Sequence, residues 1–503
     1  MLLPKKNNCE KPVYMLYLHL FVFWKNGGKH MLKKLKNLFA PRDMSQGTPW
    51  KRIAEFAFPM LIGNFCQQLY NTVDAVVVGN SRWGYTALAA VGNASPVLNL
   101  LLALFVGIST GAGILVSQYF GARDREGLSR TIGNCLTVTA IASIIVMIVG
   151  PLVTSPLLRA VGTLDSMFDG CRDYLNIYFY GIAGFFFYNI LAGVLRGLGD
   201  SFSSLLFLLV ASILNIVLDI AFVDSMGVAG VALATIIAQF VSAILCLLKL
   251  LKLRDLFTLS RNDLRPRKQY LLRIVQLGVP SGVTQAIFSL AMMVVQRLIN
   301  GFNDEMFVAC NVMIMRVDGY AMLPNFSFGQ AMSTFVGQNL GARKLDRIGK
   351  GTKQGLIMAL LTATLMTPLV LLGGPVLMRF FTPEQALIDL SMRMMYILAV
   401  GYIAVAVTQV LSGTMRGAGD TMTPMWVSFG STIALRVPLA YALVYSLKAL
   451  GSPMLTQQTM VFVSLLMSWL IGALVTAVLY KKGGWRLKQL APLAAEMARE
   501  KNQ

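Results

Sequence analysis

The hexapeptide "LRGLGD" at residues 195–200 returns as "MRGAGD" at residues 415–420, a shift of 415 − 195 = 220 residues. The same shift separates "QYFGAR" at 118–123 from "QNLGAR" at 338–343. Self-similarity at a fixed distance indicates an internal structural repeat. The Gly-Arg motifs themselves are typical of helix ends, with Asp200 and Asp420 capping the helices that follow. The chain therefore divides into two homologous halves.

Each half is predicted to be a bundle of membrane-spanning helices. The composition is 56% hydrophobic and 13% charged, against about 25% charged in soluble domains. Apolar stretches of about 20 residues, the length that spans a bilayer, recur along the whole chain. About twelve such spans are expected, at 53–79, 88–117, 131–154, 174–195, 202–223, 228–252, 272–299, 309–337, 352–376, 386–411, 420–446 and 457–480.

The predicted fold class is an all-α integral membrane protein with twelve transmembrane helices in two pseudo-symmetric six-helix bundles. Six helices per half make the repeat parallel, and substrate sites in such folds lie between the halves. We expect an N-terminal extension at 1–50, a first bundle at 51–253, a cytoplasmic linker at 254–271, a second bundle at 272–482 and a cytoplasmic tail at 483–503. In an alternative interpretation the extension is a mis-assigned start and the natural chain begins at Met31 or Met44, because its apolar run 13–24 is too short to span.

The net charge of +21 is distributed by topology. Basic residues cluster before the first span, after the second, in the central linker, and after the eighth and twelfth spans. All these connections fall on one side if the helices alternate, and the opposite loops are acidic, as at Asp165, Asp169 and Asp224. This is the positive-inside pattern, so we expect a multi-pass protein of the inner (cytoplasmic) membrane with both termini cytoplasmic. No nucleic-acid partner is needed to explain the charge.

Metal, disulfide and enzyme sites are not expected. The six cysteines show neither paired nor metal-ligand spacing, and both histidines precede the first span. No HExxH motif or clustered catalytic set occurs. We therefore expect neither a metal centre nor an enzyme.

Two acids in the first half form the candidate site. Asp74 and Asp219 lie well inside apolar spans, where charged residues are rare and usually functional. At about 1.5 Å per helical residue, both fall at a similar height to Thr235, and Asn215 shares one helix face with Asp219. Such a group of oxygens suits a proton or Na⁺. The alternative interpretation makes both aspartates helix-end residues at the outer membrane interface.

The second half lacks these acids but carries other charged residues inside its spans. At shifts of 221 and 220 residues, Val295 and Leu439 stand where the first half has Asp74 and Asp219. Arg316, Asp318 and Arg436 lie inside spans instead. We expect Asp318 and Arg436 to form a structural ion pair between the eighth and eleventh spans rather than a substrate site.

The two six-helix halves, "GAR" after the second and eighth spans, "LRGLGD" followed by "NIVLDIAF", and "VGQNLGAR" resemble the multidrug and toxic compound extrusion (MATE) family. The resemblance implies secondary active efflux of amphipathic, often cationic small molecules, driven by inward proton or Na⁺ flow. No cofactor is expected, and a monomer suffices because it holds both bundles. The resemblance also implies that Asp74, Asn215 and Asp219 match acidic and amide positions of the family, that Asn189 and Thr235 match polar ones, and that Pro59 matches a first-helix proline where the helix can kink.

Three other functions remain as alternatives. A flippase for lipid-linked oligosaccharides or lipids in the same superfamily would need several cavity cations, and only Arg316 and Arg436 are candidates. An integral-membrane enzyme lacks a catalytic set, and a channel is disfavoured by the asymmetric buried acids. Met-rich stretches such as 292–293 and 313–315 are expected to be mostly core or lipid-facing, with a minority lining an adaptable cavity.

Overall fold

The computed structural model describes residues 41–79, 84–161, 163, 165–379 and 382–486. The expectations for residues 1–40 and for most of the tail, residues 487–503, lie outside this part. The chain divides into residues 1–42, of which only residues 41 and 42 are described, and a unit that begins at Asp43.

The described residues of this unit form helices and no β-strand. The first half contains α3 (Pro49–Gly79), α4 (Gly84–Ala122), α5 (Arg125–Val161), α6 (Asp165–Tyr180), α7 (Ile182–Gly197), α8 (Ser201–Met226) and α9 (Val228–Leu251). The second half contains α10 (Lys268–Asn300), α11 (Glu305–Ala321), α12 (Leu323–Gly341), α13 (Leu345–Arg379), α14 (Gln385–Ala399), α15 (Gly401–Gly417), α16 (Met422–Ser428), the π-helix η1 (Phe429–Arg436), α17 (Val437–Ala449) and α18 (Met454–Lys482).

These helices account for the expected spans. In the described part of the chain, eight helical segments are long and apolar enough to cross a membrane, and three bent helix pairs bring the number to eleven. The remaining expected span, the first along the chain, is α3, which is 31 residues long but carries Asn64, Gln67 and Gln68 in its apolar run. The prediction of an all-α membrane protein is confirmed.

Three expected spans are bent rather than straight. The pairs α6–α7, α11–α12 and α14–α15 bend by 53°, 43° and 48°. Gly181 and Gly401, at the first and third bends, are 220 residues apart, so the repeat preserves this feature. A β-carbon at Gly181 would lie 2.3 Å from Ile236, and one at Gly401 would lie 2.3 Å from Trp469. Glycine therefore lets a neighbouring helix pack into each bend.

The eleventh span is irregular in a different way. It passes from α16 through η1 into α17, and Pro438 stands at the start of α17. Proline has no N–H to donate to the preceding turn, and π-turns inside helices occur frequently at functional sites. The irregular turn ends at Arg436, one of the intramembrane charges identified from the sequence.

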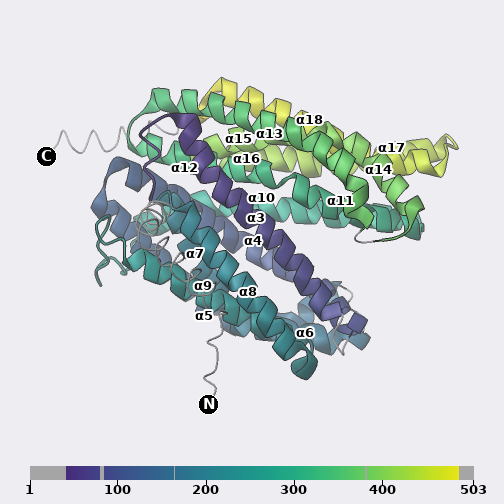
Figure 1. Ribbon diagram of the computed structural model, residues 1–503, viewed down its shortest axis with the longest axis horizontal. Helices are drawn as coiled ribbons and strands as arrows, with labels where there is room; N and C mark the ends of the chain where they lie inside the picture. The colour runs from purple at the N-terminus through teal and green to yellow at the C-terminus, as the bar shows by residue number, and fades with distance from the viewer. Residues whose placement is uncertain (1–40, 80–83, 162, 164, 380–381, 487–503) are drawn as a thin grey trace, which may run out of the picture. The chain divides into compact units, whose positions relative to one another are not determined.

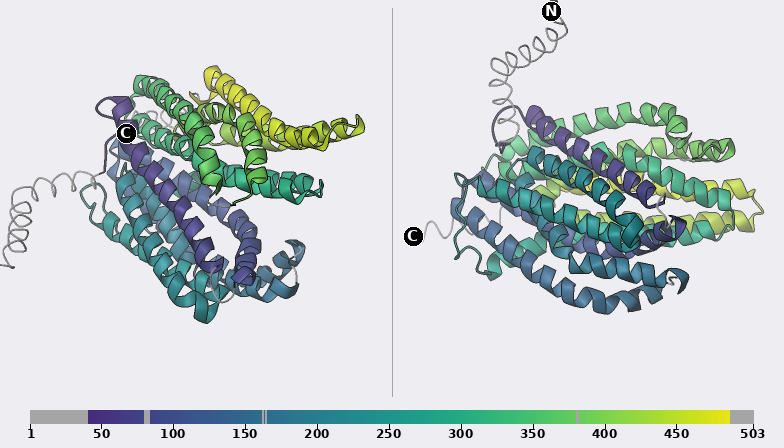
Figure 2. Two further views of the ribbon diagram at one scale, coloured as in Figure 1. Left: turned by 45° about the vertical axis from the view of Figure 1, so that its right-hand side comes forward. Right: turned by 60° about the horizontal axis from the view of Figure 1, so that its bottom comes forward.

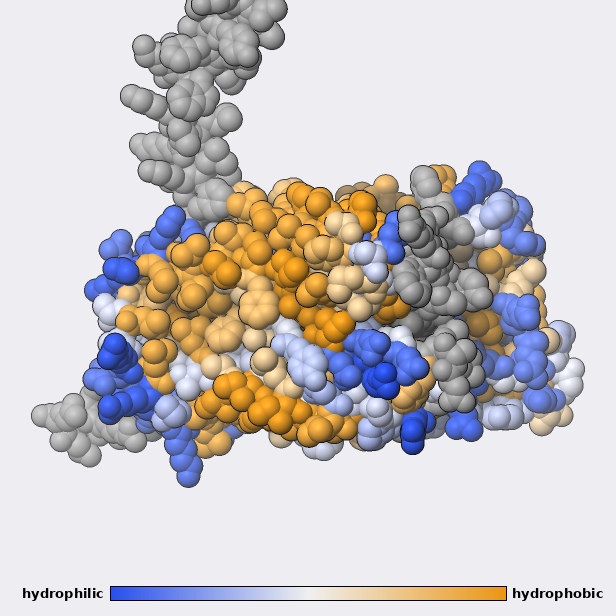
Figure 3. All heavy atoms as spheres, turned by 90° about the horizontal axis from the view of Figure 1, so that it is seen from below, coloured by the Kyte–Doolittle hydropathy of each residue, from blue (hydrophilic) through white to orange (hydrophobic). Residues whose placement is uncertain are grey.

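The outer surface is that of a membrane protein. Apolar side chains cover most of the face shown in Figure 3 between the polar groups at its left and right edges, and a smaller polar patch interrupts them. On α5 and α13, which occupy equivalent places in the two halves, Leu152 and Leu372 are 72% and 80% exposed. Exposed leucines on such long apolar helices are suited to contact with lipid tails.

Within each half the helices pack side by side. In Figures 1 and 2, α7, α8 and α9 lie together on one side, while α13, α15 and α18 lie together on the other. The two groups are joined mainly through α4, which packs along α10 and α12, and through α3, which contacts both α8 and α12.

Glycines set the crossing of α4 and α10. A β-carbon at Gly107 would lie 2.1 Å from the backbone nitrogen of Gly282, and one at Gly111 would lie 2.5 Å from that of Gly278. Both helices place these glycines four residues apart, the small-xxx-small spacing that lets helix backbones touch in a membrane. The two halves of the protein meet backbone to backbone at this point.

The repeated motifs meet one another across the two halves. The Gln118 side chain donates to the Gly417 carbonyl at 3.0 Å, and the Gln338 side chain donates to the Gly197 carbonyl, also at 3.0 Å. Gln118 and Gln338 occupy equivalent positions of the repeat, 220 residues apart, and so do Gly197 and Gly417. We call this reciprocal pair the glutamine clasp.

The expected helix caps are confirmed, because Asp200 accepts from the backbone N–H of Ser203 and Asp420 from that of Thr423.

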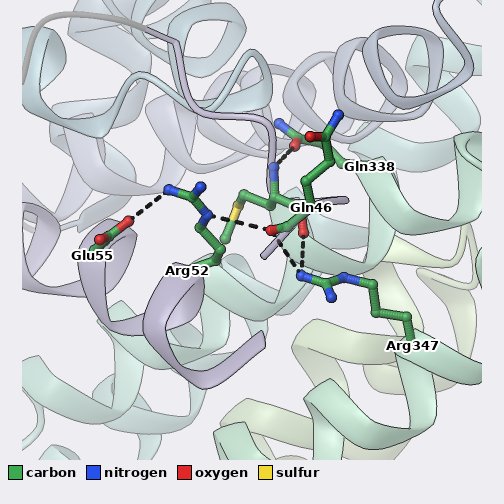
Figure 4. Close-up of polar contacts among 6 residues, drawn as sticks. Gln46, Arg52, Glu55, Gln338 and Arg347 are labelled. Atoms are coloured by element: carbon green, nitrogen blue, oxygen red, sulfur yellow. Dashed lines mark hydrogen bonds and ion pairs between the residues drawn. The ribbon is translucent and has the colours of Figure 1, made fainter. Parts of the chain in front are cut away.

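A short strap, residues 43–48, ties the start of the first half to the second. The backbone N–H of Met44 donates to Gln338 Oε1 at 2.7 Å, and Arg347 donates to the Gln46 carbonyl at 3.0 Å (Figure 4). Arg52, at the start of α3, also donates to the Gln46 carbonyl and forms an ion pair with Glu55. The described end of the expected N-terminal extension is therefore part of the helical unit.

The linker between the halves is also held in place. Thr258 donates its backbone N–H to Ser129, Arg267 donates its own to Asn134, and both acceptors belong to α5. Residues 254–267 thus run along the first half before α10 begins.

Substituting Gly107 with alanine should destabilise the protein strongly, because the new methyl group cannot fit against Gly282. We expect a large fall in the melting temperature of the protein purified in detergent. The matched control is Gly373→Ala in α13, where a β-carbon would meet nothing within 4 Å. That variant should melt at or slightly above the wild-type temperature, since alanine favours helix over glycine by about 1 kcal/mol. Equal melting temperatures for the two variants would contradict the close crossing.

Removing either glutamine of the clasp should destabilise the protein, and the two losses of stability should differ. Gln118→Ala removes one partly buried hydrogen bond and leaves a carbonyl unsatisfied, which costs up to about 1–3 kcal/mol. Gln338→Ala should cost more, because it also removes the acceptor for the Met44 N–H. Thermal unfolding in detergent measures both, with Gln354→Ala, whose bond to the Trp50 N–H is exposed, as the mild reference. A smaller effect at Gln338 than at Gln118 would refute the strap contact.

Candidate functional site

The first half holds a buried polar pair on α8. Asn215 and Asp219 are 1% and 0% exposed and lie one turn apart. The Asn215 side-chain amide donates to the Thr235 hydroxyl of α9 at 3.3 Å, and that hydroxyl donates to the Val231 carbonyl at 3.0 Å. The structure thus brings together three of the residues predicted from the sequence, and a carboxyl, an amide and a hydroxyl stand at the α8–α9 contact.

Asp74 lies on the neighbouring helix. Its backbone belongs to α3, which packs along α8, the helix of Asp219. The Asp74 side chain lies outside the described residues. Pro59 stands inside α3, which continues through it as one helix from Pro49 to Gly79.

Asn189 is engaged in its own helix. Its side-chain amide donates to the Phe185 carbonyl at 2.8 Å, one turn earlier on α7. Its backbone carbonyl accepts from the Ser109 hydroxyl of α4 at 2.6 Å. Asn189 therefore supports the packing of α7 on α4 and takes no part in the bond between Asn215 and Thr235.

The second half contains a cavity of about 890 Å³, which we call the C-terminal cavity. Its walls come from α10, α11, α12, α15, the α16–η1 segment and α18, all of the second half. Met292, Met293 and Met315 line it, so part of the Met-rich stretches does face a cavity, whereas Met313 is buried in the core. Phe326 and Trp469 add aromatic surface.

Asp318 and Arg436 both line this cavity. The Tyr402 hydroxyl donates to Asp318 Oδ1 at 2.5 Å, and Tyr402 stands directly after the bend between α14 and α15. Arg436 is near enough to attract the carboxylate electrostatically, but among the ion pairs of the described residues there is none within 4 Å between the two. Arg316 is exposed on another side of α11 and does not line the cavity.

The acid and the arginine belong to the second half alone. At the shift of 220 residues, the first half has Leu98 where the second has Asp318, and Ile216 where it has Arg436. Tyr402 corresponds to Ile182 in the same way. The second half thus has a polar cavity wall where the first half has apolar residues.

Sequence reasoning missed several residues of this wall. Tyr402 gave no signal, because a tyrosine in a span is usually packed or interfacial. Gln296 and Asn311 also line the cavity and are joined by a hydrogen bond of 2.8 Å. Gln409 could have been found, because it stands 220 residues after Asn189 and keeps a polar group there.

Among the described residues, no group of three or more His, Cys, Asp or Glu side chains could hold a metal ion. The two sites offer carboxylate, hydroxyl and amide groups, and two arginines, Arg297 and Arg436, line the C-terminal cavity.

Known proteins of one family are similar to this chain. A family model described as MatE matches the chain twice, over residues 59–221 and 280–442, together more than half of its length. The two matches begin 280 − 59 = 221 residues apart and confirm the internal repeat.

The curated relatives are similar over most of their length. The probable multidrug resistance protein YpnP of Bacillus subtilis is 28% identical over 451 residues, which cover 89% of this chain and 98% of the relative. The probable multidrug resistance protein YoeA of the same organism is 27% identical over 409 residues, with 79% and 88% covered. The probable multidrug resistance protein NorM of Thermotoga maritima is 25% identical over 411 residues, with 80% and 88% covered.

Solved structures share the fold. An outward-facing multidrug resistance MATE family transporter of the MOP superfamily superimposes with a TM-score of 0.81 at 24% identity, covering 89% of this chain and 97% of the other. A MOP superfamily transporter of Pyrococcus furiosus, described as having a binding pocket of reversed polarity that suggests a different function, gives 0.80 at 24% identity, with 88% and 97% covered.

Removing the Tyr402 hydroxyl should destabilise the protein, because the half-buried Asp318 carboxyl loses a hydrogen bond. Tyr402→Phe leaves the Asp318 carboxyl without its hydrogen-bond donor, which costs about 1.5–3 kcal/mol for a charged group. Adding Asp318→Leu should recover part of this loss, because both polar partners are then gone. Thermal unfolding in detergent measures the double-mutant cycle, with Tyr441→Phe as the control for an exposed tyrosine bond. Strict additivity of the two changes would rule out the coupling.

Proposed function

Since the chain belongs to the multidrug and toxic compound extrusion (MATE) family, whose members are membrane transporters and not enzymes, we propose that it is a secondary active multidrug efflux transporter. It would export amphipathic and cationic small molecules in exchange for protons or Na⁺. The names of the curated relatives support export of several compounds. The observation that carries the coupling is the fully buried Asp219 beside Asn215 on a membrane-spanning helix.

The buried polar pair Asn215 and Asp219 on α8, with Thr235 of α9, has the chemistry of a cation site. An ionised carboxyl inside a span costs free energy. Such groups are therefore rare, and those that occur are paired or mark the pathway of an ion. Asp219 lies in a helix that packs against α3, the helix to which the backbone of Asp74 belongs, and the Asn215 and Thr235 oxygens would add neutral ligands. A proton neutralises such a site, and Na⁺ is bound by its oxygens, so either ion would change its charge.

The charge change would be converted into movement by α3. When Asp74 and Asp219 take up the ion from outside, a buried charge is removed and α3 can bend at Pro59, where a backbone donor is missing. The bend would shrink the space in the first bundle and release the compound held there. Residues 51–253 and 272–482 would then act as two rocking units joined by the linker 254–271.

The contacts between the halves fit a two-state cycle. Closure on one side of the membrane would use the glutamine clasp and the strap, and opening would break them while the α4–α10 crossing acts as the pivot. Both termini would be cytoplasmic in the inner membrane, and one chain would suffice, since it contains both bundles.

Asp219→Asn keeps the shape of the side chain but not its charge, so it should insert normally and fail in gradient-driven export. Asp74→Asn should behave in the same way. The matched control is Asp224→Asn, five residues further along α8, where the acid is exposed, and it should transport as the wild type does. The measurement is uptake of a fluorescent cation into everted membrane vesicles, with proton and Na⁺ gradients applied separately and expression matched by blotting. Undiminished uptake by Asp219→Asn would disprove the coupling role, and the gradient that drives the wild type identifies the ion.

A further inference from the structure

Arg436 is the starting point, because its charge is not matched by a bonded partner. Its Nε atom is buried and has no hydrogen-bond acceptor among the described residues. Its electrostatic partner Asp318 already accepts the hydrogen bond of Tyr402, and the two form no ion pair within 4 Å. A buried guanidinium donor without an acceptor costs free energy, so it either reflects strain or awaits a ligand.

The position of Arg436 favours a ligand. It ends the π-helix η1, and such turns occur frequently at functional sites because they redirect a side chain. Here the redirected arginine lines the C-terminal cavity. The equivalent residue of the first half is Ile216, so the repeat does not require a charge at this place.

The charges of the cavity wall sum to a positive value. Three charged residues line it, Arg297 and Arg436 with positive charge and Asp318 with negative charge, so the formal total is 2 − 1 = +1. The amides nearby are partly occupied, since Asn311 donates to Gln296 and Gln296 donates to Asn300. A group that balances this wall carries one negative charge and accepts hydrogen bonds.

The rest of the wall suits an apolar body. Met292, Met293, Met315, Phe326 and Trp469 supply flexible and aromatic surface. Methionine repacks around ligands of different shape, which suits varied compounds. The volume of about 890 Å³ lies within the range of about 300–1,000 Å³ that is usual for small-molecule sites.

We propose that the C-terminal cavity is a binding site for amphipathic anions, in which a carboxylate, sulfonate or phosphate group pairs with Arg436 and an apolar body lies against the methionines and Trp469. This goes beyond the proposed export function, because the site is separate from the cation site on α8 and is defined by binding alone. The anion can come from a free compound or from an anionic lipid, and both have the same chemistry.

The test uses two probes that differ by one group. 1-Anilinonaphthalene-8-sulfonate carries a sulfonate, and N-phenyl-1-naphthylamine is its uncharged counterpart. The full chain is placed in phosphatidylcholine nanodiscs without any ion gradient, and binding is measured as energy transfer from tryptophan, after subtraction of the Trp469→Phe signal. We expect Arg436→Gln to weaken sulfonate binding at least tenfold and to leave binding of the uncharged probe within twofold. Asp318→Asn should tighten sulfonate binding.

Two control variants separate the loss of this arginine from general effects on charge or folding. Arg316→Gln removes an arginine of α11 that does not line the cavity and should change neither probe. Arg436→Lys keeps the charge and should retain most of the sulfonate affinity, so it serves if Arg436→Gln folds poorly. Competition by phosphatidylglycerol that is lost in Arg436→Gln would assign the site to a lipid, and its absence would assign it to a free compound.

Equal sulfonate binding by the wild type and Arg436→Gln would overturn the proposal, and so would a parallel loss for both probes. Because no gradient is applied, failure here would leave the proposed export function untouched. Conversely, loss of export in Asp219→Asn would say nothing about this cavity.

Discussion

The close crossing of α4 and α10 is the contact on which the rest of the structure depends. Helices in a membrane gain little from the hydrophobic effect, so they associate through tight packing of small residues. Gly107 and Gly111 meet Gly282 and Gly278 with backbones in direct contact. α4 also packs on α7 of its own half and on α12 of the other. One helix therefore holds the core of each half and joins the two.

Symmetry governs the contacts of the scaffold. Gln118 and Gln338 make the same bond to equivalent glycine carbonyls, and Asp200 and Asp420 cap equivalent helices. Repeated sequence motifs in this protein serve the interface and the helix ends. A motif that appears in both halves is thus better evidence for architecture than for chemistry.

Asymmetry governs the candidate sites. Asp219 has an apolar counterpart in the second half, and Asp318 and Arg436 have apolar counterparts in the first. Each half keeps the same helices and places ionisable groups at different positions on them. Under the two proposals, this separation would allow one bundle to bind a coupling ion while the other holds a ligand of different charge, without the two sites having to change together.

The sequence by itself determined the class, the repeat and the family, because hydrophobic length and a fixed shift of motifs are properties of the chain read in one dimension. It also predicted that Asn215, Asp219 and Thr235 lie near one another, since polar residues in apolar spans are conspicuous and helical spacing is regular. Only the tertiary structure decided that Tyr402 holds Asp318 and that Arg436 faces a cavity. Those facts depend on a helix bend and a π-turn, which redirect side chains and arise from packing between distant segments.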